Sequence, residues 1–325
     1  MLVEASLAIV VGLIILVWSA DRFVDGAAAL ARYLGMSPLL IGILIIGFGT
    51  SMPEMVVSAL SALNGSPGIA LGNAYGSNIT NIALILGLTA LIKPLTVHGS
   101  VIKKELPILL IVTLLSAYFL FDMRIARLEA IALLALFIGY VAWTIWSSKK
   151  QRVTIQANYE EDNSEQHLSF KSALFWLIIG LALLMLSSQL LIWGAVKIAH
   201  YLGVSDLVIG LTVVAIGTSL PEVAASIAAA RKGEVDLAVG NIIGSNLYNT
   251  LAVVGLAGVI MPIQAENAVL SRDMLVMLSL TLALFVLGFI AYKKRGQIGR
   301  LSGFLFLSSY IGYTAFLIHT AVITN

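Results

Sequence analysis

The sequence has no cysteine and few charged residues, and each shortage restricts what the chain can be. None of the 325 residues is a cysteine, which excludes disulfides and thiolate metal sites. Charged residues make up 11% of the chain, whereas a soluble domain carries about 25%. With 59% hydrophobic residues and a mean hydropathy of +1.00, most of the chain faces lipid or packed helix.

Histidine and net charge are also low. The four histidines are scattered and form neither an HExxH motif nor another paired ligand spacing. A net charge of +2 gives no indication of a nucleic-acid partner. The composition therefore suggests neither a histidine-rich metal site nor a nucleic-acid partner.

The apolar runs predict an all-α membrane protein with ten transmembrane helices, about 20 residues each. The first run has only Glu4 as an early charge, so we interpret it as a membrane helix and not as a signal peptide, which begins with positive charge. A polar linker at residues 148–171 divides the chain into a first five-helix repeat at 1–147 and a second at 172–325. The runs lie at residues 5–26, 39–63, 70–92, 105–121, 128–147, 173–195, 207–230, 237–260, 273–292 and 300–322.

The two halves repeat at a constant offset of 168 residues, which is 222 minus 54 for the two glutamates Glu54 and Glu222. A register that keeps Gly, Pro, Asn and Glu in step indicates duplication. Because five spans is an odd number, the second half enters the membrane from the opposite side, and the repeats are predicted to be inverted. The aligned stretches are GTSMPE (49–54) with GTSLPE (217–222), GNAYGSNITN (72–81) with GNIIGSNLYN (240–249), and Lys104-Glu105 with Arg272-Asp273.

Lysine and arginine predict the orientation, because cytoplasmic loops carry an excess of both. The loops that follow the odd-numbered spans carry fourteen of them, and the opposite side carries four. We therefore expect both termini outside and the central loop in the cytoplasm. The fourteen are Arg32, Lys93, Lys103, Lys104, Lys149, Lys150, Arg152, Lys171, Arg231, Lys232, Lys293, Lys294, Arg295 and Arg300, and the four are Arg124, Arg127, Lys197 and Arg272.

The GTSMPE motif places a carboxylate and a helix break together in the membrane. Pro53 has no N–H, so the helix cannot run through unbroken, and we expect the carbonyls of residues 49–51 to lose their usual partners. Glu54 lies beside this break, and an ionisable residue at membrane depth marks an ion or substrate pathway by default. Paired sites of this kind in matching positions of two repeats are typical of a transporter.

The donor atoms of the paired motifs are all oxygens, from carboxylates, hydroxyls, amides and backbone carbonyls. Hard cations such as Ca²⁺ and Na⁺ prefer this set. Two simpler roles remain open for the uncharged members. The hydroxyls could bond back to their own broken helix, and the serines and asparagines of the second motif could bond between helices.

At these motifs the chain resembles the cation/Ca²⁺ exchanger superfamily, in its sodium/calcium exchanger-like branch, and most closely the compact prokaryotic YrbG-type members. GTSMPE with GSNITN, and GTSLPE with GSNLYN, are similar to the two conserved repeats of that family. The resemblance implies alternating access at one central site, with Na⁺ or H⁺ moving against Ca²⁺. The implied cation ligands are Glu54, Glu222, Thr50, Ser51, Ser77, Asn81, Thr218, Ser219, Ser245 and Asn249.

Asn81 and Asn249 stand where some family members carry Asp, a residue that the family associates with K⁺ co-transport, so we expect no K⁺ dependence. The short linker leaves no room for a large regulatory domain. We expect an inner-membrane protein of a prokaryote with lipid and transported ions as its partners, no cofactor, and no enzymatic activity. One chain makes both halves of the site, so a monomer is sufficient.

Three functions remain open at this point. The favoured one is an antiporter that exchanges Ca²⁺ for Na⁺, and the alternative is a Ca²⁺ antiporter driven by H⁺. A cation channel is more remote, because channels usually surround a pore with several subunits. An intramembrane hydrolase is not favoured, since no histidine partners the motif serines. Glu105 lies at a predicted span end, where we expect substitution to be mild.

Overall fold

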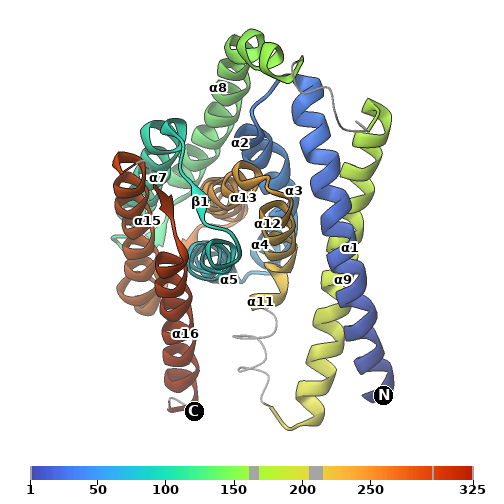
Figure 1. Cartoon of the computed structure of the whole chain (residues 1–325). Helices are drawn as coiled ribbons and strands as arrows, with labels where there is room; N and C mark the ends of the chain where they lie inside the picture. Colours follow the sequence, from blue (N-terminus) through green and yellow to red (C-terminus); the bar gives the residue numbers. More distant parts are fainter. Residues whose placement is uncertain (1, 161–167, 205–214, 295, 324–325) are drawn as a thin grey trace.

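The computed structural model describes residues 2–160, 168–204, 215–294 and 296–323, and nearly all of them are helical (Figure 1). In chain order the first half contains α1 (Leu2–Leu34), α2 (Pro38–Ile41), η1 (Gly42–Gly47), α3 (Phe48–Thr50), α4 (Met52–Leu63), α5 (Gly68–Ile79), η2 (Thr80–Leu86), α6 (Gly87–Ile92), β1 (Leu95–Thr96), η3 (Val101–Glu105), α7 (Leu106–Phe119), β2 (Arg124–Ile125) and α8 (Arg127–Glu160). The second half contains α9 (Phe170–Tyr201), α11 (Ala215–Thr218), α12 (Leu220–Lys232), α13 (Val235–Tyr248), η5 (Asn249–Val253), α14 (Val254–Ile260), β3 (Ile263–Gln264), η6 (Val269–Met274), α15 (Leu275–Lys293), β4 (Gln297–Ile298) and α16 (Arg300–Ile323). The η elements are π-helical turns.

These helices form ten spans in two inverted halves, which confirms the predicted fold class. Seven continuous spans in the described residues are long and apolar enough to cross a membrane, and the bent pair Pro38–Thr50 with Met52–Leu63 adds an eighth. The segment η3 with α7 and the segment α11 with α12 complete the ten. In Figure 1 the start of α1 and the end of α16 lie at one end of the molecule, and the end of α8 and the start of α9 lie at the other, as an odd number of spans per half requires.

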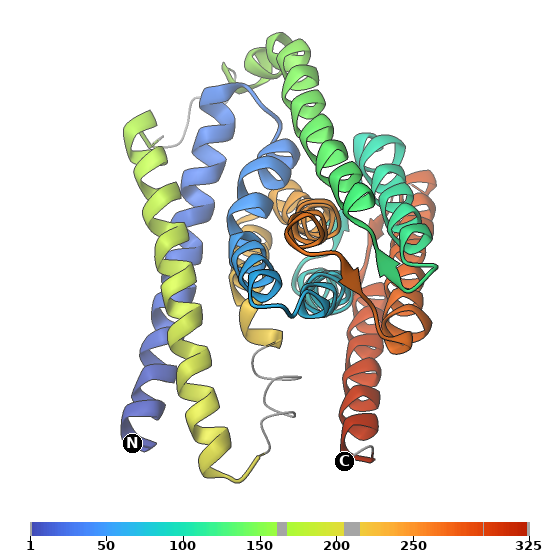
Figure 2. The same cartoon turned by 180° about the vertical axis from the view of Figure 1, so that it is seen from behind.

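Four helices, α4, α5, α12 and α13, form the centre of the molecule (Figures 1 and 2). The long helices α1 and α9 pack along each other on one side of this centre and contact it mainly through α12. The helices α7, α15 and α16 lie on the other side, with α8 behind them in the first view. Apolar side chains on the outer helices are widely exposed, for example Leu7, Leu186 and Phe304, as expected for surfaces in contact with lipid.

Two short sheets connect the halves and repeat the internal symmetry. Strand β1 pairs with β4, and β2 pairs with β3, so each sheet takes one strand from each half. The π-helical turns repeat as well, because η3 begins at Val101 and η6 at Val269, again 168 residues apart. The offset changes only in the fifth span, where β2 begins at 124 and β4 at 297, a difference of 173.

Three helices extend beyond the predicted apolar runs. Helix α1 continues to Leu34 and α9 to Tyr201, because nothing stops either helix before Gly35 and Gly203. Both glycines have positive φ, 59° and 76°, which is the usual left-handed end of a helix. Helix α8 continues to Glu160, so the part of the predicted linker from 148 to 160 is helical and not a loop. Residues 161–167 of that linker lie outside the described residues.

Candidate functional site

Each GTS(M/L)PE motif lies at an interruption in its own helix, and the backbone geometry of the interruption is the same in both halves. Ser51 has φ −85° and ψ 2° and Ser219 has φ −88° and ψ 3°, so each serine interrupts the helix just before its proline. In the first half the helices on either side of this point are bent by 43°. Glu54 and Glu222 then lie in the first turns of α4 and α12. The positive end of each helix dipole faces this turn, which favours a negative charge there.

The two glutamates are buried together in the centre of the molecule. Glu54 is 0% exposed and Glu222 is 2% exposed. The hydroxyl of Ser51 donates a hydrogen bond of 3.4 Å to Oε1 of Glu222, which joins the bend of one half to the carboxylate of the other. No lysine or arginine in the described part of the chain forms an ion pair with either glutamate. Two carboxylates are thus held close together with no protein charge to balance them.

Several buried oxygens of the motifs have no hydrogen-bond partner among the described residues. Uncompensated burial of such groups is costly, and native structures contain few of them. Most of them come from twin positions of the two repeats. They are both carboxylate oxygens of Glu54, Oε2 of Glu222, the amide oxygens of Asn78, Asn81 and Asn249, and the hydroxyl of Ser219.

Two asparagines that the sequence reasoning missed hold the glutamate backbone in place. The side-chain amide of Asn73 donates to the carbonyl of Glu54 at 3.1 Å and to the hydroxyl of Ser58 at 2.9 Å. Its twin Asn241 donates to the carbonyl of Glu222 at 3.3 Å and to Ser226 at 2.8 Å. The repeated Gly-Asn that opens the second motif was the signal that could have identified them.

The hydroxyls of the first repeat are partly engaged in local bonds. Oγ1 of Thr50 lies 3.1 Å from the carbonyl oxygen of Ile46 and 3.2 Å from Oδ1 of Asn241, so the back-bonding alternative is observed for this residue. A hydroxyl that donates its hydrogen in this way keeps its oxygen lone pairs for a cation. The carbonyl of Ser51 accepts from the N–H of Met55 at 3.2 Å. The prediction that this carbonyl loses its partner is therefore wrong, because only one residue of the helix is displaced.

The remaining motif residues divide between the buried site and a cavity. Ser245 and Asn249 are 0% and 1% exposed. Ser77 and Thr218 line a cavity of about 390 Å³ that reaches the surface between α5, η6 and α16. Asn78 takes the other predicted alternative, since its amide donates to Thr250 of the second half at 2.8 Å and bonds between helices.

Glycines allow backbone atoms of the two halves to come into direct contact. A Cβ built on Gly240 would lie 2.3 Å from the carbonyl oxygen of Leu39, and one built on Gly244 would lie 2.8 Å from that of Ile43. Around the twin glycines Gly72 and Gly76, no atom of the described residues lies within 4 Å of such a Cβ. In the second half this face is therefore packed against the backbone of α2 and η1. The positions that correspond to Leu39 and Ile43 at the 168-residue offset, 207 and 211, lie outside the described residues.

The sequence and the fold are similar to those of known proteins. The family model for the sodium/calcium exchanger protein matches residues 5–146 and 172–319, one stretch in each half. The chain belongs to the sodium/calcium exchanger family. Both motif pairs lie inside the matched stretches, so the family match includes every residue of the candidate site.

Individual relatives cover nearly the whole chain. CaxA of Alkalimonas amylolytica is 46% identical over 95% of this chain and 97% of its own length. The inner membrane protein YrbG of Escherichia coli (strain K12) is 38% identical over 96% of both chains. A solved structure of the sodium-calcium exchanger NCX_Mj, soaked with Na⁺ and Sr²⁺, matches with a TM-score of 0.84 at 35% identity and covers 97% of this chain and 99% of that chain. These matches confirm the resemblance to the prokaryotic branch and support cation/Ca²⁺ exchange as the class of activity in a multi-pass membrane protein.

Proposed function

We propose that this chain is a secondary antiporter that exchanges Ca²⁺ for Na⁺ at one central site. The observation that carries the proposal is the cluster of buried oxygens without hydrogen-bond partners in the described residues, above all those of the twin residues Glu54 and Glu222 and of Asn81 and Asn249. The proposed ligands are Glu54, Glu222, Thr50, Ser51, Ser77, Asn81, Thr218, Ser219, Ser245 and Asn249.

Charge balance supports Ca²⁺ as one of the transported ions. A cation that leaves most of its water behind needs its charge compensated, because an unpaired charge in a low-dielectric site is very costly. Glu54 and Glu222 supply two negative charges, which match one Ca²⁺. Asn81 and Asn249 add oxygens without charge. Na⁺ ions can be balanced by the same two carboxylates, so the two kinds of ion compete for one set of ligands.

The asymmetry between the halves supports an antiporter over a channel. Ser77 and Thr218 line an open cavity, whereas their twins Ser245 and Thr50 are both 0% exposed. Among the described residues, a cavity thus leads to Ser77, which is 5% exposed, and to Thr218, whereas the glutamates themselves are buried. A channel needs a continuous path through both sides, whereas alternating access needs only one open side at a time.

Na⁺ is the proposed driving ion, because the glutamates are surrounded by hydroxyl and amide oxygens that suit Na⁺ as well as Ca²⁺. The alternative driver is H⁺, since the same carboxylates can be protonated. The name of NCX_Mj as a sodium-calcium exchanger, and the fold it shares with this chain, favour Na⁺.

The test is Ca²⁺ flux into vesicles that contain the purified protein. A Na⁺ gradient at clamped pH should drive Ca²⁺ uphill, and a pH gradient in the absence of Na⁺ should not. If only the pH gradient drives flux, H⁺ is the coupling ion. Downhill Ca²⁺ movement that neither gradient can reverse would identify a channel and overturn the proposal.

The orientation is part of the proposal. The excess of lysine and arginine on one side of the membrane places both termini outside and the connection between α8 and α9 in the cytoplasm. In a prokaryote, the membrane concerned is the inner membrane. The cavity that reaches Ser77 then opens to the outside.

A further inference from the structure

A cluster of ionisable side chains outside the central site lines the same cavity. Arg272, Asp273 and Tyr313 form part of its wall, together with Ser77 and Thr218 of the site. The π-helical turn η6 that carries Arg272 and Asp273 follows the connection at residues 261–268, which lies on the side of the termini. The cluster therefore shares one cavity with two of the proposed ligands.

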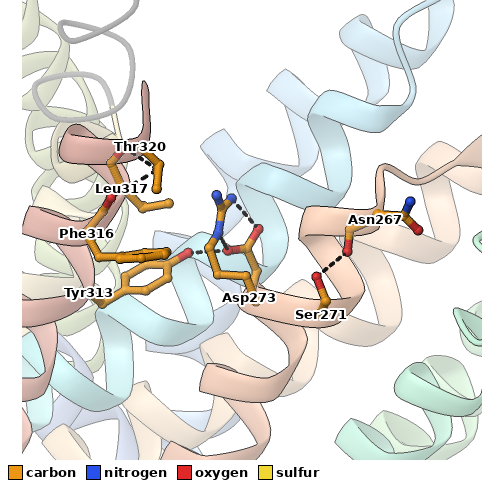
Figure 3. Close-up of polar contacts among 8 residues, drawn as sticks. Asn267, Ser271, Asp273, Tyr313, Phe316, Leu317 and Thr320 are labelled. Carbon is orange, nitrogen blue, oxygen red and sulfur yellow. Dashed lines mark hydrogen bonds and ion pairs between the residues drawn. The ribbon is translucent and has the colours of Figure 1, made fainter. Parts of the chain in front are cut away.

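The geometry of the cluster is that of a neutralised ion pair. Nε of Arg272 donates to Oδ1 of Asp273 at 2.6 Å, and Nη2 donates to Oδ2 at 3.0 Å. The hydroxyl of Tyr313, on α16, donates to Oδ1 of Asp273 at 2.8 Å (Figure 3). The Asp273 side chain is 12% exposed and that of Arg272 is 30% exposed. Tyr313 thus holds the carboxylate in the position where it compensates the arginine.

The first half contains the same arrangement at twin positions. Nζ of Lys104 lies 3.4 Å from Oε1 of Glu105, and the hydroxyl of Tyr140 donates to Oε2 at 2.8 Å. Lys104 and Glu105 are offset by 168 residues from Arg272 and Asp273, and Tyr140 by 173 from Tyr313, as in the rest of the fifth span. Glu105 lies near the start of its span, as predicted, but its side chain is only 1% exposed, so we no longer expect its substitution to be mild. A basic residue, an acidic residue and a tyrosine thus form the same contacts at twin positions of both halves, outside the ion site. This repetition indicates a function for the cluster.

We propose that the Arg272–Asp273 pair, held by Tyr313, sets the electrostatic potential of the cavity through which cations reach the site from the side of the termini. This inference rests on the proposed function, because it concerns access of cations to the central site.

The physical reason is the double charge of Ca²⁺. An uncompensated arginine in the cavity wall would repel a divalent cation, and an uncompensated aspartate would attract it. At a separation of about 10 Å in a water-filled cavity, one unit charge changes the local concentration of a divalent cation by roughly three- to tenfold. The pair keeps the entrance close to neutral, so Ca²⁺ enters without a barrier and also leaves without being retained.

A purely structural role makes a different prediction. The cluster also joins η6 to α16 across a groove that Arg272 and Tyr313 line on their other side. If it acts only as this link, removal of either charged partner breaks the link, and both variants should impair transport in the same direction.

The experiment measures the apparent KM for Ca²⁺ on the side of the termini, in vesicles of known orientation. Asp273→Asn should raise KM about three- to tenfold and Arg272→Gln should lower it by a similar factor. The double variant should return close to wild type, and the shifts should shrink at high ionic strength. Arg272→Lys keeps the charge but loses the bidentate geometry, and its KM should stay within about twofold of wild type.

Shifts of the two single variants in the same direction, or shifts that do not depend on salt, would overturn the inference. If Asp273→Asn does not insert at a normal level, Arg272→Gln and Arg272→Lys decide, because only the charge mechanism separates them. The proposed function fails separately, if wild-type protein exchanges no Ca²⁺ or if the glutamates of the central site prove dispensable.

Discussion

The twin glycines Gly72 and Gly240 give a sharp test of how closely the backbone packs at the two motif pairs. A Cβ on Gly240 would lie 2.3 Å from the Leu39 carbonyl oxygen and 2.9 Å from the Cα of Gly42. Both neighbours are backbone atoms, so no flexible side chain can move aside. A Cβ on Gly72 meets no atom of the described residues within 4 Å.

The magnitude follows from two opposing effects. Overpacking a close-packed site costs typically about 1–3 kcal/mol, and more when backbone must shift. Replacing glycine by alanine inside a helix stabilises by about 1 kcal/mol. Gly240→Ala should therefore lose about 2 kcal/mol or more of unfolding free energy, whereas Gly72→Ala should gain up to about 1 kcal/mol.

The assay is thermal unfolding of both variants in the same detergent, with wild type alongside. The difference of about 3 kcal/mol between the twins corresponds to a gap of roughly 5–10 °C in apparent Tm. Equal apparent Tm values for the two variants would mean that the halves are packed alike, and the reasoning from the structure would be refuted.

Three further predictions concern function and topology. Gly72→Ala should bind Ca²⁺ normally but slow exchange, because the opposite-facing state needs Gly72 packed as Gly240 is now; a normal exchange rate would argue against this swap. Asn241→Ala removes the hydrogen bonds to Glu222 and Ser226 and should cost about 1–3 kcal/mol, measured by Tm, together with weaker Ca²⁺ binding in a titration, and full retention of both would contradict the role given to this asparagine. Cysteines introduced at Ser66 and at Asn158 should be labelled by an impermeant reagent from opposite faces, Ser66 from outside, and labelling of both from one face would contradict the inverted topology.

Much of the architecture could be predicted from the sequence, because duplication preserves residues that are hard to keep by chance. The proline break and the glutamate beside it predict the bend at Ser51 and its twin Ser219, and the odd number of spans predicts the inversion. Hydropathy does not predict where a helix stops. Helix α1 therefore extends past its apolar run to Leu34, just before Gly35, and α8 extends past its run to Glu160.

The rest depends on tertiary contacts that identical motifs do not encode. Gly72 and Gly240 lie in matching sequences, but only the structure shows that Gly240 lies against the backbone of Leu39 and Gly42. The sequence places Glu105 at the end of a span, near a membrane surface. Only the structure shows that Tyr140 of the next span, α8, covers it and donates to its carboxylate. The repeated Gly-Asn marks Asn73 and Asn241 in the sequence, but only the structure shows that their side chains bind the carbonyls of Glu54 and Glu222.

The most direct test of the central claim is Ca²⁺ binding and Na⁺-driven Ca²⁺ exchange in Glu54→Gln and Glu222→Gln. Each substitution keeps the shape of the side chain but leaves a bound Ca²⁺ with one uncompensated charge. The loss of a partner for a buried charge costs about 3–5 kcal/mol, or more than a hundredfold in affinity. Glu266→Gln, at an exposed position, is the matched control and should behave as wild type. Exchange at background level in both site variants, with normal amounts in the membrane, is the predicted result. Exchange near the wild-type rate in either variant would mean that these glutamates do not form the site.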